Sequence, residues 1–324
     1  MEDNFHREVN YLRISVTEQC NLRCFYCRPS VDKTPVREQL TNRDLVRIVK
    51  AAAKAGINRV RLTGGEPLVR PGIVDLTRAI NSISGIKEVS ITTNGVLLPD
   101  YIVELKKAGL KRTNISLDTL KPDRYKKITR TGNLEDVWRG IECALAEGLD
   151  PVKINSVLIK GVNEDEICDL AQLSVDYPLH VRFIELMPIG EGAAMPCERM
   201  ISAGETRAVL EGRYGPLLPG DNIAGSGPAS YFKLPDARGT IGFIAALSHN
   251  FCQRCNRIRL TATGGLRPCL YKPEELDVAG LIARGASEDE LIAQIKRTVA
   301  MKPERHHMEE GGTGENKLMS QIGG

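Results

Sequence analysis

Short apolar runs alternate with longer amphipathic segments over roughly the first 190 residues. Six runs rich in β-branched residues predict strands at 11–17, 59–63, 88–93, 112–117, 152–158 and 180–186. The stretches between them space their apolar positions as helices do. This order predicts a parallel sheet with crossover helices, and six such units predict an α/β fold of the incomplete (β/α)6 TIM-type barrel class.

Two of the intervening helices carry clear end signals. The segment 40–56 has Thr41 or Asn42 as a candidate N-cap and Gly56 as a candidate end. The segment 163–176 begins with acidic residues, which suit a helix N-terminus. Both segments are therefore expected to be crossover helices.

The second part of the chain lacks the regular alternation of strand and helix patterns. From about residue 195 it contains a Gly- and Pro-rich stretch, a short strand near 240–247 and a helix over 287–301. This predicts a barrel domain over 1–190 and a smaller, irregular C-terminal domain over 191–324. The polar, glycine-rich residues 306–324 are expected to form a flexible tail.

Composition and charge exclude little. The 324 residues carry a formal net charge of +3 and a pI near 8.3, too mild to indicate a nucleic-acid or membrane partner. We find no signal peptide and no apolar run of membrane-spanning length, which predicts a cytoplasmic protein. The nine cysteines are then expected to be reduced, and six of them form two clusters, leaving Cys143, Cys168 and Cys197 as ordinary thiols.

Unusual loops follow most of the predicted strands. They are CNLRCFYC at 20–27, GGEP at 64–67, TNG at 93–95, LD at 117–118 and MPIG at 187–190. Because active-site groups of such barrels project from the C-terminal ends of the strands, these loops predict a cofactor pocket at one rim. On the fifth strand, Lys153 and Asn155 share one face, although a lone strand lysine is more often exposed.

The first cysteine cluster offers three ligands and no fourth. Cys20, Cys24 and Cys27 form C-x3-C-x2-C, whereas a structural zinc site normally has four protein ligands. A [4Fe-4S] cluster held by three thiolates leaves one iron open to an amine and a carboxylate of another molecule. The spacing favours this cluster, with zinc as the alternative.

The second cluster is more ambiguous on spacing. Cys252, Cys255 and Cys269 form C-x2-C-x13-C, and His249 could complete a zinc site. Arg257 and Arg259 follow at once and would share one face of an extended segment, as a fork suited to phosphate. Two solvated arginines are the ordinary alternative.

At its first cluster the chain resembles the radical S-adenosylmethionine (SAM) superfamily. The same cysteine spacing occurs there, with an aromatic residue before the last cysteine, here Tyr26. The stretch GGEP resembles the motif that contacts the amino group of SAM, and Glu66 is suited to balance an ammonium. The resemblance implies that SAM binds the open iron and is cleaved reductively to a 5′-deoxyadenosyl radical.

Over nearly its whole length, from about residue 10 to 324, the chain resembles the GTP 3′,8-cyclase family, molybdenum cofactor biosynthesis protein A. The segments that carry this likeness are YLRISVTEQCNLRCFYC, RLTGGEPLVR, ITTNG, NISLDTL, VKINSVLIKGVN, RFIELMPIG, NFCQRCNRIRLTATGGLRPCL and the terminal GG. Few radical SAM proteins combine the second cysteine pattern, an adjacent RxR and a C-terminal double glycine.

This resemblance implies two [4Fe-4S] clusters, the second of which binds the purine of GTP. By position it implies SAM contacts from Tyr26, Gly65, Glu66, Ser116 and Met187. It implies GTP contacts from Arg13, Arg61, Thr92, Lys153, Arg257, Ile258 and Arg259, which turns Lys153 inward. It further implies that the tail residues Gly323 and Gly324 enter the active site.

The implied reaction converts GTP to (8S)-3′,8-cyclo-7,8-dihydroguanosine 5′-triphosphate through hydrogen abstraction at ribose C3′. The implied partners are an external electron donor and the downstream cyclic pyranopterin monophosphate synthase, with a monomer or homodimer expected. Two alternatives remain open. A peptide-modifying radical SAM enzyme usually has more C-terminal cysteines, and a zinc-stabilised RNA-binding protein would need more aromatic residues than the 5% found here.

Overall fold

The computed structural model describes residues 1–29, 37–220, 227–308 and 317–323. One continuous twelve-stranded sheet forms its centre, in the order β12-β11-β10-β1-β2-β3-β4-β5-β6-β9-β8-β7. The strands are β1 (Tyr11–Ser15), β2 (Arg59–Thr63), β3 (Glu88–Thr93), β4 (Thr113–Ser116), β5 (Val152–Leu158), β6 (Leu179–Glu185), β7 (Leu218–Pro219), β8 (Ser230–Lys233), β9 (Thr240–Ile244), β10 (Arg257–Leu260), β11 (Gly265–Arg267) and β12 (Leu276–Asp277).

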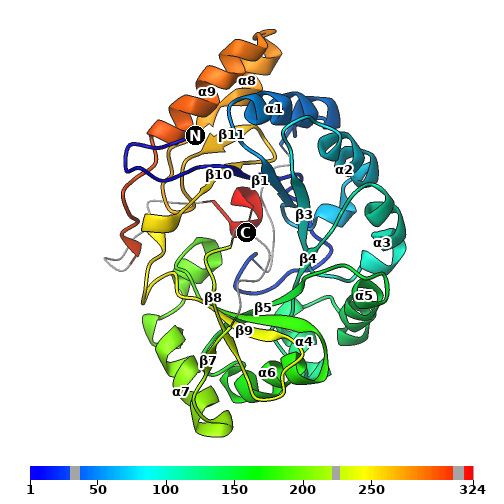
Figure 1. Ribbon diagram of the computed structural model, residues 1–324, viewed down its shortest axis with the longest axis vertical. Coiled ribbons are helices and arrows are strands. Elements are labelled where there is room, and N and C mark those ends of the chain that lie inside the picture. Colours follow the sequence, from blue (N-terminus) through cyan, green and yellow to red (C-terminus); the bar gives the residue numbers. More distant parts are fainter. Residues whose placement is uncertain (30–36, 221–226, 309–316, 324) are drawn as a thin grey trace.

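All six predicted barrel strands are confirmed, and so is the strand near 240–247. Strands β1 to β6 pair in parallel in sequence order, and the sheet curves into a barrel that does not close. Strand β10 adds in parallel beside β1, and β9 adds in parallel beside β6. Strands from the second part of the chain therefore extend the barrel sheet at both of its edges (Figure 1).

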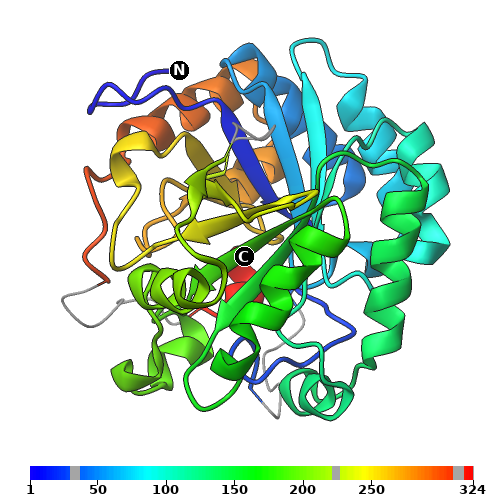
Figure 2. The same ribbon diagram turned by 60° about the horizontal axis from the view of Figure 1, so that its bottom comes forward.

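Helices cover the outer face of the sheet (Figures 1 and 2). They are α1 (Asn42–Lys54), α2 (Ile73–Asn81), α3 (Leu98–Lys107), α4 (Pro122–Thr129), α5 (Leu134–Ala146), α6 (Ile167–Asp176), α7 (Ala203–Tyr214), α8 (Val278–Ala283) and α9 (Glu288–Ala300), with α10 (Met319–Ile322) on the inner side. A single apolar core fills the space between sheet and helices, with Leu12, Ile14, Val60, Leu62 and Ile154 fully buried in it. Alternate residues of the same strands therefore face the barrel interior.

The helix predictions hold with one shift. Helix α1 begins after Thr41, which forms a capping box with Asp44, and the chain leaves it at Gly56 with a φ of 107°. Helix α9 is confirmed, with Ser287 as its cap. Helix α6 begins only at Ile167, because Glu164–Glu166 form a short 3-10 turn first.

The predicted flexible tail is wrong for the described residues 306–308 and 317–323. His306 and Met308 are buried. Ser320, Gln321 and Ile322 are buried, and α10 lies within the curve of the sheet (Figure 1). Ile322 packs with Ile189 and Met308 in a small apolar cluster. Residues 309–316 and Gly324, which complete the predicted tail, lie outside the described residues.

Candidate functional site

Basic side chains from four strands face the interior of the barrel. Arg13 on β1 lies in register with Arg61 on β2 and Arg259 on β10. Arg61, Lys153 and Arg259 are 5%, 2% and 5% exposed. Lys153 on β5 is therefore buried, as the resemblance implied. The general expectation that a lone lysine on a strand is exposed does not hold here. Strand pairing alone brings these cations together.

Burial and the mutual repulsion of these cations lower their pKa values. Burial, followed by the nearby Arg182, Arg112 and Arg61, lowers the pKa of Lys153 to about 6. Burial lowers the pKa of Arg61 to about 10, and burial together with Arg257 lowers that of Arg259 to about 10. Like charges in a low-dielectric interior disfavour their own ionisation, so a polyanion bound here would relieve the cost.

Two of the predicted GTP contacts need separate description. Thr92 lies on β3 in register with Asn114, whose side-chain amide donates to the Thr92 hydroxyl at 3.2 Å. Ile258, between Arg257 and Arg259, points the other way and is fully buried in the apolar core. Only the backbone of Ile258 is therefore available to a ligand in the barrel.

Several residues of this interior escaped the sequence analysis. Arg182 on β6 is 3% exposed and lies in register with Asn155. The Tyr231 ring, from β8, lies 5.3 Å from the Lys153 ammonium, and Tyr231 interacts electrostatically with Arg182. Side chains alternate along the predicted strand 180–186, so Arg182 lies on the same face as His180. This alternation could have identified Arg182 as an interior residue. Tyr231 had no such signal, because its strand lies at the end of the Gly- and Pro-rich stretch, where no strand was predicted.

The first cysteine cluster occupies the loop after β1, half-buried. The backbone amide of Leu22 lies 3.4 Å from the Cys20 sulfur, and the Asn94 side-chain amide lies 3.8 Å from it. Burial raises the pKa of Cys20 to about 11 and that of Cys27 to about 12. Each of the three thiols interacts electrostatically with the other two, so the predicted trio is brought together.

The GGEP loop is packed against this cysteine loop by backbone contacts. The Gly65 amide donates to the Thr17 carbonyl and the Glu66 amide to the Gln19 carbonyl, each at 2.7 Å. A Cβ on Gly65 would lie only 2.2 Å from the Gln19 carbonyl oxygen. Glycine is thus required for the two loops to approach each other.

The Glu66 carboxylate turns away from solvent and accepts three hydrogen bonds. Its donors are the Leu68 amide at 3.0 Å, the Thr93 hydroxyl at 2.7 Å and the Asn94 amide at 2.7 Å. These hydrogen bonds lower the pKa of Glu66, but burial has the larger effect and raises it to about 7. The carboxylate therefore ties the loops after β2 and β3 together, whatever else it binds.

Tyr26 is held by the carboxylate of Asp118, which follows β4. Its hydroxyl donates to Asp118 at 2.6 Å, while the other Asp118 oxygen accepts from the Val157 amide at 2.8 Å. Burial raises the pKa of Asp118 to about 6. Ser116 ends β4 just before this pair, and Met187 packs against the small cluster that holds Ile322.

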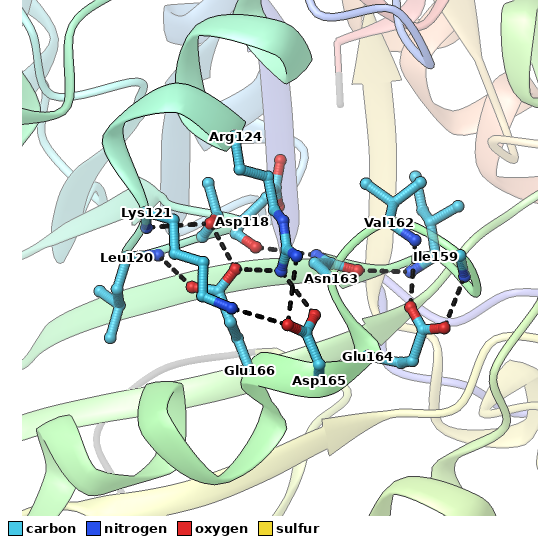
Figure 3. A network of polar contacts seen from close by, with 12 residues as sticks. Asp118, Leu120, Lys121, Arg124, Ile159, Val162, Asn163, Glu164, Asp165 and Glu166 are labelled. Carbon is cyan, nitrogen blue, oxygen red and sulfur yellow. Dashed lines mark hydrogen bonds and ion pairs between the residues drawn. The ribbon is translucent and has the colours of Figure 1, made fainter.

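Figure 3 shows the polar network that fixes the loops carrying Asp118. The Asn163 amide donates to the Asp118 and Val157 carbonyls at 2.8 and 2.9 Å. The fully buried Glu166 accepts from the Leu120 amide at 2.7 Å and pairs with Arg124. The loops after β4 and β5 thereby form one rigid support for Tyr26.

The second cysteine cluster lies beside the start of β10. Cys252 begins a 3-10 turn, and the Cys255 amide donates to the Cys252 carbonyl at 3.1 Å. Burial raises the pKa of Cys255. The positive charges of Lys302 and Arg257 outweigh burial and lower this pKa to about 6. His249, the fourth ligand of the zinc alternative, is exposed.

The donor sets suit clusters better than single ions. Zinc holds thiolates at about 2.3 Å and so draws its ligands around one point. Among residues 1–29, 37–220, 227–308 and 317–323, no three Cys, His, Asp or Glu side chains are grouped around such a point. An iron–sulfur cluster places each thiolate on a different iron. Three neighbouring but separate thiols fit that requirement in both trios.

The C-terminal tail connects the two trios. The Ser320 backbone amide hydrogen-bonds to the Cys27 thiol, and the Ser320 carbonyl accepts from the Ser15 hydroxyl at 3.4 Å. Three residues on, the Gly323 carbonyl accepts a hydrogen bond from Arg259, which interacts electrostatically with Cys255 and Cys269. Both trios and the interior cations therefore border one space, which the tail enters.

Within the described ranges, no helix is both long enough and apolar enough to cross a bilayer.

Comparison with known proteins defines the class first. Residues 14–174 match the family model described as Radical SAM superfamily, and residues 179–308 match Molybdenum Cofactor Synthesis C. In overall shape the chain is similar to Streptococcus suis SuiB bound to S-adenosylmethionine, with a TM-score of 0.65 at 16% identity over 89% of this chain and 68% of that one. At that identity the likeness concerns the fold alone. The fold is that of a radical SAM enzyme.

Full-length relatives narrow the assignment. The chain is 52% identical to the GTP 3′,8-cyclase of Pelotomaculum thermopropionicum and 50% identical to that of Moorella thermoacetica, with all of each chain covered. It is also 50% identical over full length to the GTP 3′,8-cyclase of Desulforamulus reducens. The chain belongs to the GTP 3′,8-cyclase family, and its cofactors are SAM and two [4Fe-4S] clusters.

Proposed function

We propose that the chain converts GTP to (8S)-3′,8-cyclo-7,8-dihydroguanosine 5′-triphosphate in molybdenum cofactor biosynthesis. The observation that carries this proposal is the set of buried cations from β2, β5 and β10, joined by the half-buried Arg13 of β1, which border the same space as two cysteine trios. A triphosphate is the counterpart that such a set requires, because it carries several negative charges.

In this proposal the first trio, Cys20, Cys24 and Cys27, holds the SAM cluster, and Cys252, Cys255 and Cys269 hold the substrate cluster. With SAM bound and one electron supplied through the first cluster, the site would provide a 5′-deoxyadenosyl radical, with methionine as the leaving group, for hydrogen abstraction at ribose C3′. The proposed SAM contacts are Tyr26, Gly65, Glu66, Ser116 and Met187. The proposed GTP contacts are Arg13, Arg61, Thr92, Lys153, Arg257, the Ile258 backbone and Arg259.

The chain's own residues orient and enclose the substrate. Arg257 and Arg259 lie on one face of β10 and direct two guanidinium groups at the phosphates. Lys153 reaches the phosphates from β5, on the opposite side of the barrel. The tail around Gly323 covers the space between the trios and keeps water from a reactive intermediate. The arrangement supports ring closure on one bound substrate.

The proposal also covers partners and organisation. An external electron donor reduces the first cluster, and cyclic pyranopterin monophosphate synthase uses the product. The protein acts in the cytoplasm as a monomer or homodimer. We keep the division into 1–190 and 191–324 for the functional units, although β9 and β10 extend the barrel sheet.

The test is anaerobic reconstitution followed by incubation with SAM, dithionite and GTP. Mass spectrometry should detect 5′-deoxyadenosine and a cyclised GTP isomer of unchanged mass. Iron should reach about eight per chain without zinc, because each cluster carries four irons. Replacing Cys252, Cys255 and Cys269 by Ser should remove half of the iron and all of the cyclised product.

The same replacement at Cys143, Cys168 and Cys197 is the matched control and should leave iron and product unchanged. Formation of 5′-deoxyadenosine with GTP untouched would remove the substrate assignment and favour a peptide substrate. Zinc in place of iron would remove the radical chemistry altogether.

A further inference from the structure

Lys302 lies against the second cysteine trio from the side of α9. It follows that helix by two residues and is 4% exposed. Its ammonium donates to the Arg257 carbonyl at 2.8 Å and the Pro268 carbonyl at 3.1 Å, and lies 3.5 Å from the Cys255 sulfur. An ammonium has three hydrogens, so these three contacts account for all of its donors.

These contacts join two separate stretches of the chain. The Arg257 carbonyl lies just beyond Cys255, and the Pro268 carbonyl lies just before Cys269. The ligand pattern C-x2-C-x13-C leaves the position of its third cysteine to the intervening residues, which form β10 and β11. Lys302 bridges the ends of that insertion and fixes where Cys269 stands relative to Cys255.

The charge of Lys302 is compensated differently from that of the nearby Arg7. Arg7 donates to the Cys252 carbonyl at 2.8 Å, but it also pairs with Asp3 at 2.6 Å. In the described part of the chain, Lys302 contacts two carbonyls and a thiol and no carboxylate within ion-pair distance. Of these contacts, the Cys255 sulfur is the group that carries a negative charge when it ligates a metal.

We propose that Lys302 is a positioning residue of the second iron–sulfur cluster, which holds the Cys255 thiolate and the Cys269 arm in place and raises the cluster's reduction potential. This inference rests on the proposed function for the presence of that cluster. The potential of a cluster depends on its net charge and on hydrogen bonds to its sulfurs, and Lys302 supplies both a positive charge and a donor. A positive charge near the sulfur stabilises the reduced form, which is the more negative one.

The experiment compares Lys302→Met, Lys302→Arg and the control Lys296→Met, an exposed lysine on the preceding helix α9. Each is made in the full chain with Cys20, Cys24 and Cys27 replaced by Ala, so that only the second cluster contributes. The readouts are iron per chain, circular dichroism and the midpoint potential from an EPR-monitored redox titration. The unsubstituted Lys302 protein shows whether the second cluster is present, which separates this test from that of the proposed function.

We expect Lys302→Met to shift the potential to a more negative value or to lose the cluster's iron from a folded chain. Lys302→Arg should stay near the parent in iron and potential, and Lys296→Met should match the parent. An unchanged potential with full iron in Lys302→Met would overturn the proposal. Loss of the whole fold in both Lys302 variants would also overturn it, by assigning Lys302 to general stability.

Discussion

The hydroxyl of Tyr26 donates a hydrogen bond to the carboxylate of Asp118 across 2.6 Å, which joins the cysteine loop after β1 to the loop after β4. Asp118 is itself anchored by the Val157 amide at 2.8 Å. A residue adjacent to Cys27 is therefore positioned by two distant strands. The geometry of the first trio depends on the barrel as a whole and not on the loop alone.

This bond should be measurable by a double-mutant cycle. Tyr26→Phe and Asp118→Asn should each destabilise the protein, with a coupling free energy of about 1–3 kcal/mol, because the bond is buried and its acceptor is a carboxylate. The measurement is the free energy of unfolding in urea for the parent, both single variants and the double variant. Tyr101→Phe combined with Asp118→Asn is the control and should be additive; additivity for Tyr26 as well would refute the coupling.

Glu66 should make stability depend on pH in an unusual direction. Its pKa is about 7 in the folded chain and near 4.5 when unfolded, so the folded state binds the extra proton between these values. The contribution of Glu66 to the free energy of unfolding should therefore fall by about 3 kcal/mol as pH rises from 4.5 to 7. Urea unfolding of the SAM-free protein across this range measures the slope.

Glu66→Gln should remove that contribution, whereas the contributions of Asp118 and Lys153, which also titrate in this range, should remain. The variant should also cost stability because an amide nitrogen would face the Asn94 amide. The exposed Glu135→Gln is the matched control and should retain the slope. A profile in Glu66→Gln with the same slope as the parent would show that the hydrogen bonds to Glu66 outweigh its burial.

The tail should be needed for turnover and not for cluster assembly. Deleting Gly323 and Gly324 should remove formation of cyclised GTP while leaving iron content unchanged. Gly323→Ala should act in the same direction, because its φ of 81° disfavours a side chain and a Cβ would lie 3.1 Å from Thr63. Gly212→Ala, where a Cβ meets nothing, is the control. Normal turnover by the truncated chain would contradict the tail's role.

Lys153 should take up a proton when GTP binds. Its pKa of about 6 leaves it largely neutral at pH 7.5, and a bound triphosphate should raise that pKa and charge it. Calorimetric titrations with GTP in buffers of different ionisation enthalpy measure the proton uptake. Lys153→Met should lower the uptake by roughly one proton and weaken binding; the same uptake in this variant would place the proton elsewhere.

Arg257 should serve GTP and not SAM. Arg257→Ala should reduce formation of cyclised GTP by roughly 10- to 100-fold, the effect of one lost charged contact, while uncoupled 5′-deoxyadenosine formation continues. Arg254, exposed in the same loop, gives the control Arg254→Ala. Kinetics with GTP that match the parent would mean that Arg257 is not a substrate contact.

Local patterns in the sequence determined the elements of this fold. The six barrel strands and helices α1 and α9 follow from periodicity and capping residues such as Thr41 and Ser287, which act within a few residues of themselves. The cysteine spacings likewise predicted two trios of candidate ligands. The alternation Arg257-Ile258-Arg259 determined that two guanidinium groups share a face, which β10 confirms.

Only the tertiary structure decided what those faces meet. Parallel pairing of β10 with β1 places Arg259 beside Arg13, and pairing of β9 with β6 brings Tyr231 over Lys153. The sequence predicted a flexible tail over residues 306–324, yet Ile322 is buried, because its apolar partners come from distant loops. Lys302 gave no local signal for the same reason. Contacts between residues far apart in sequence are set by strand pairing and packing, which the pattern of a single segment does not contain.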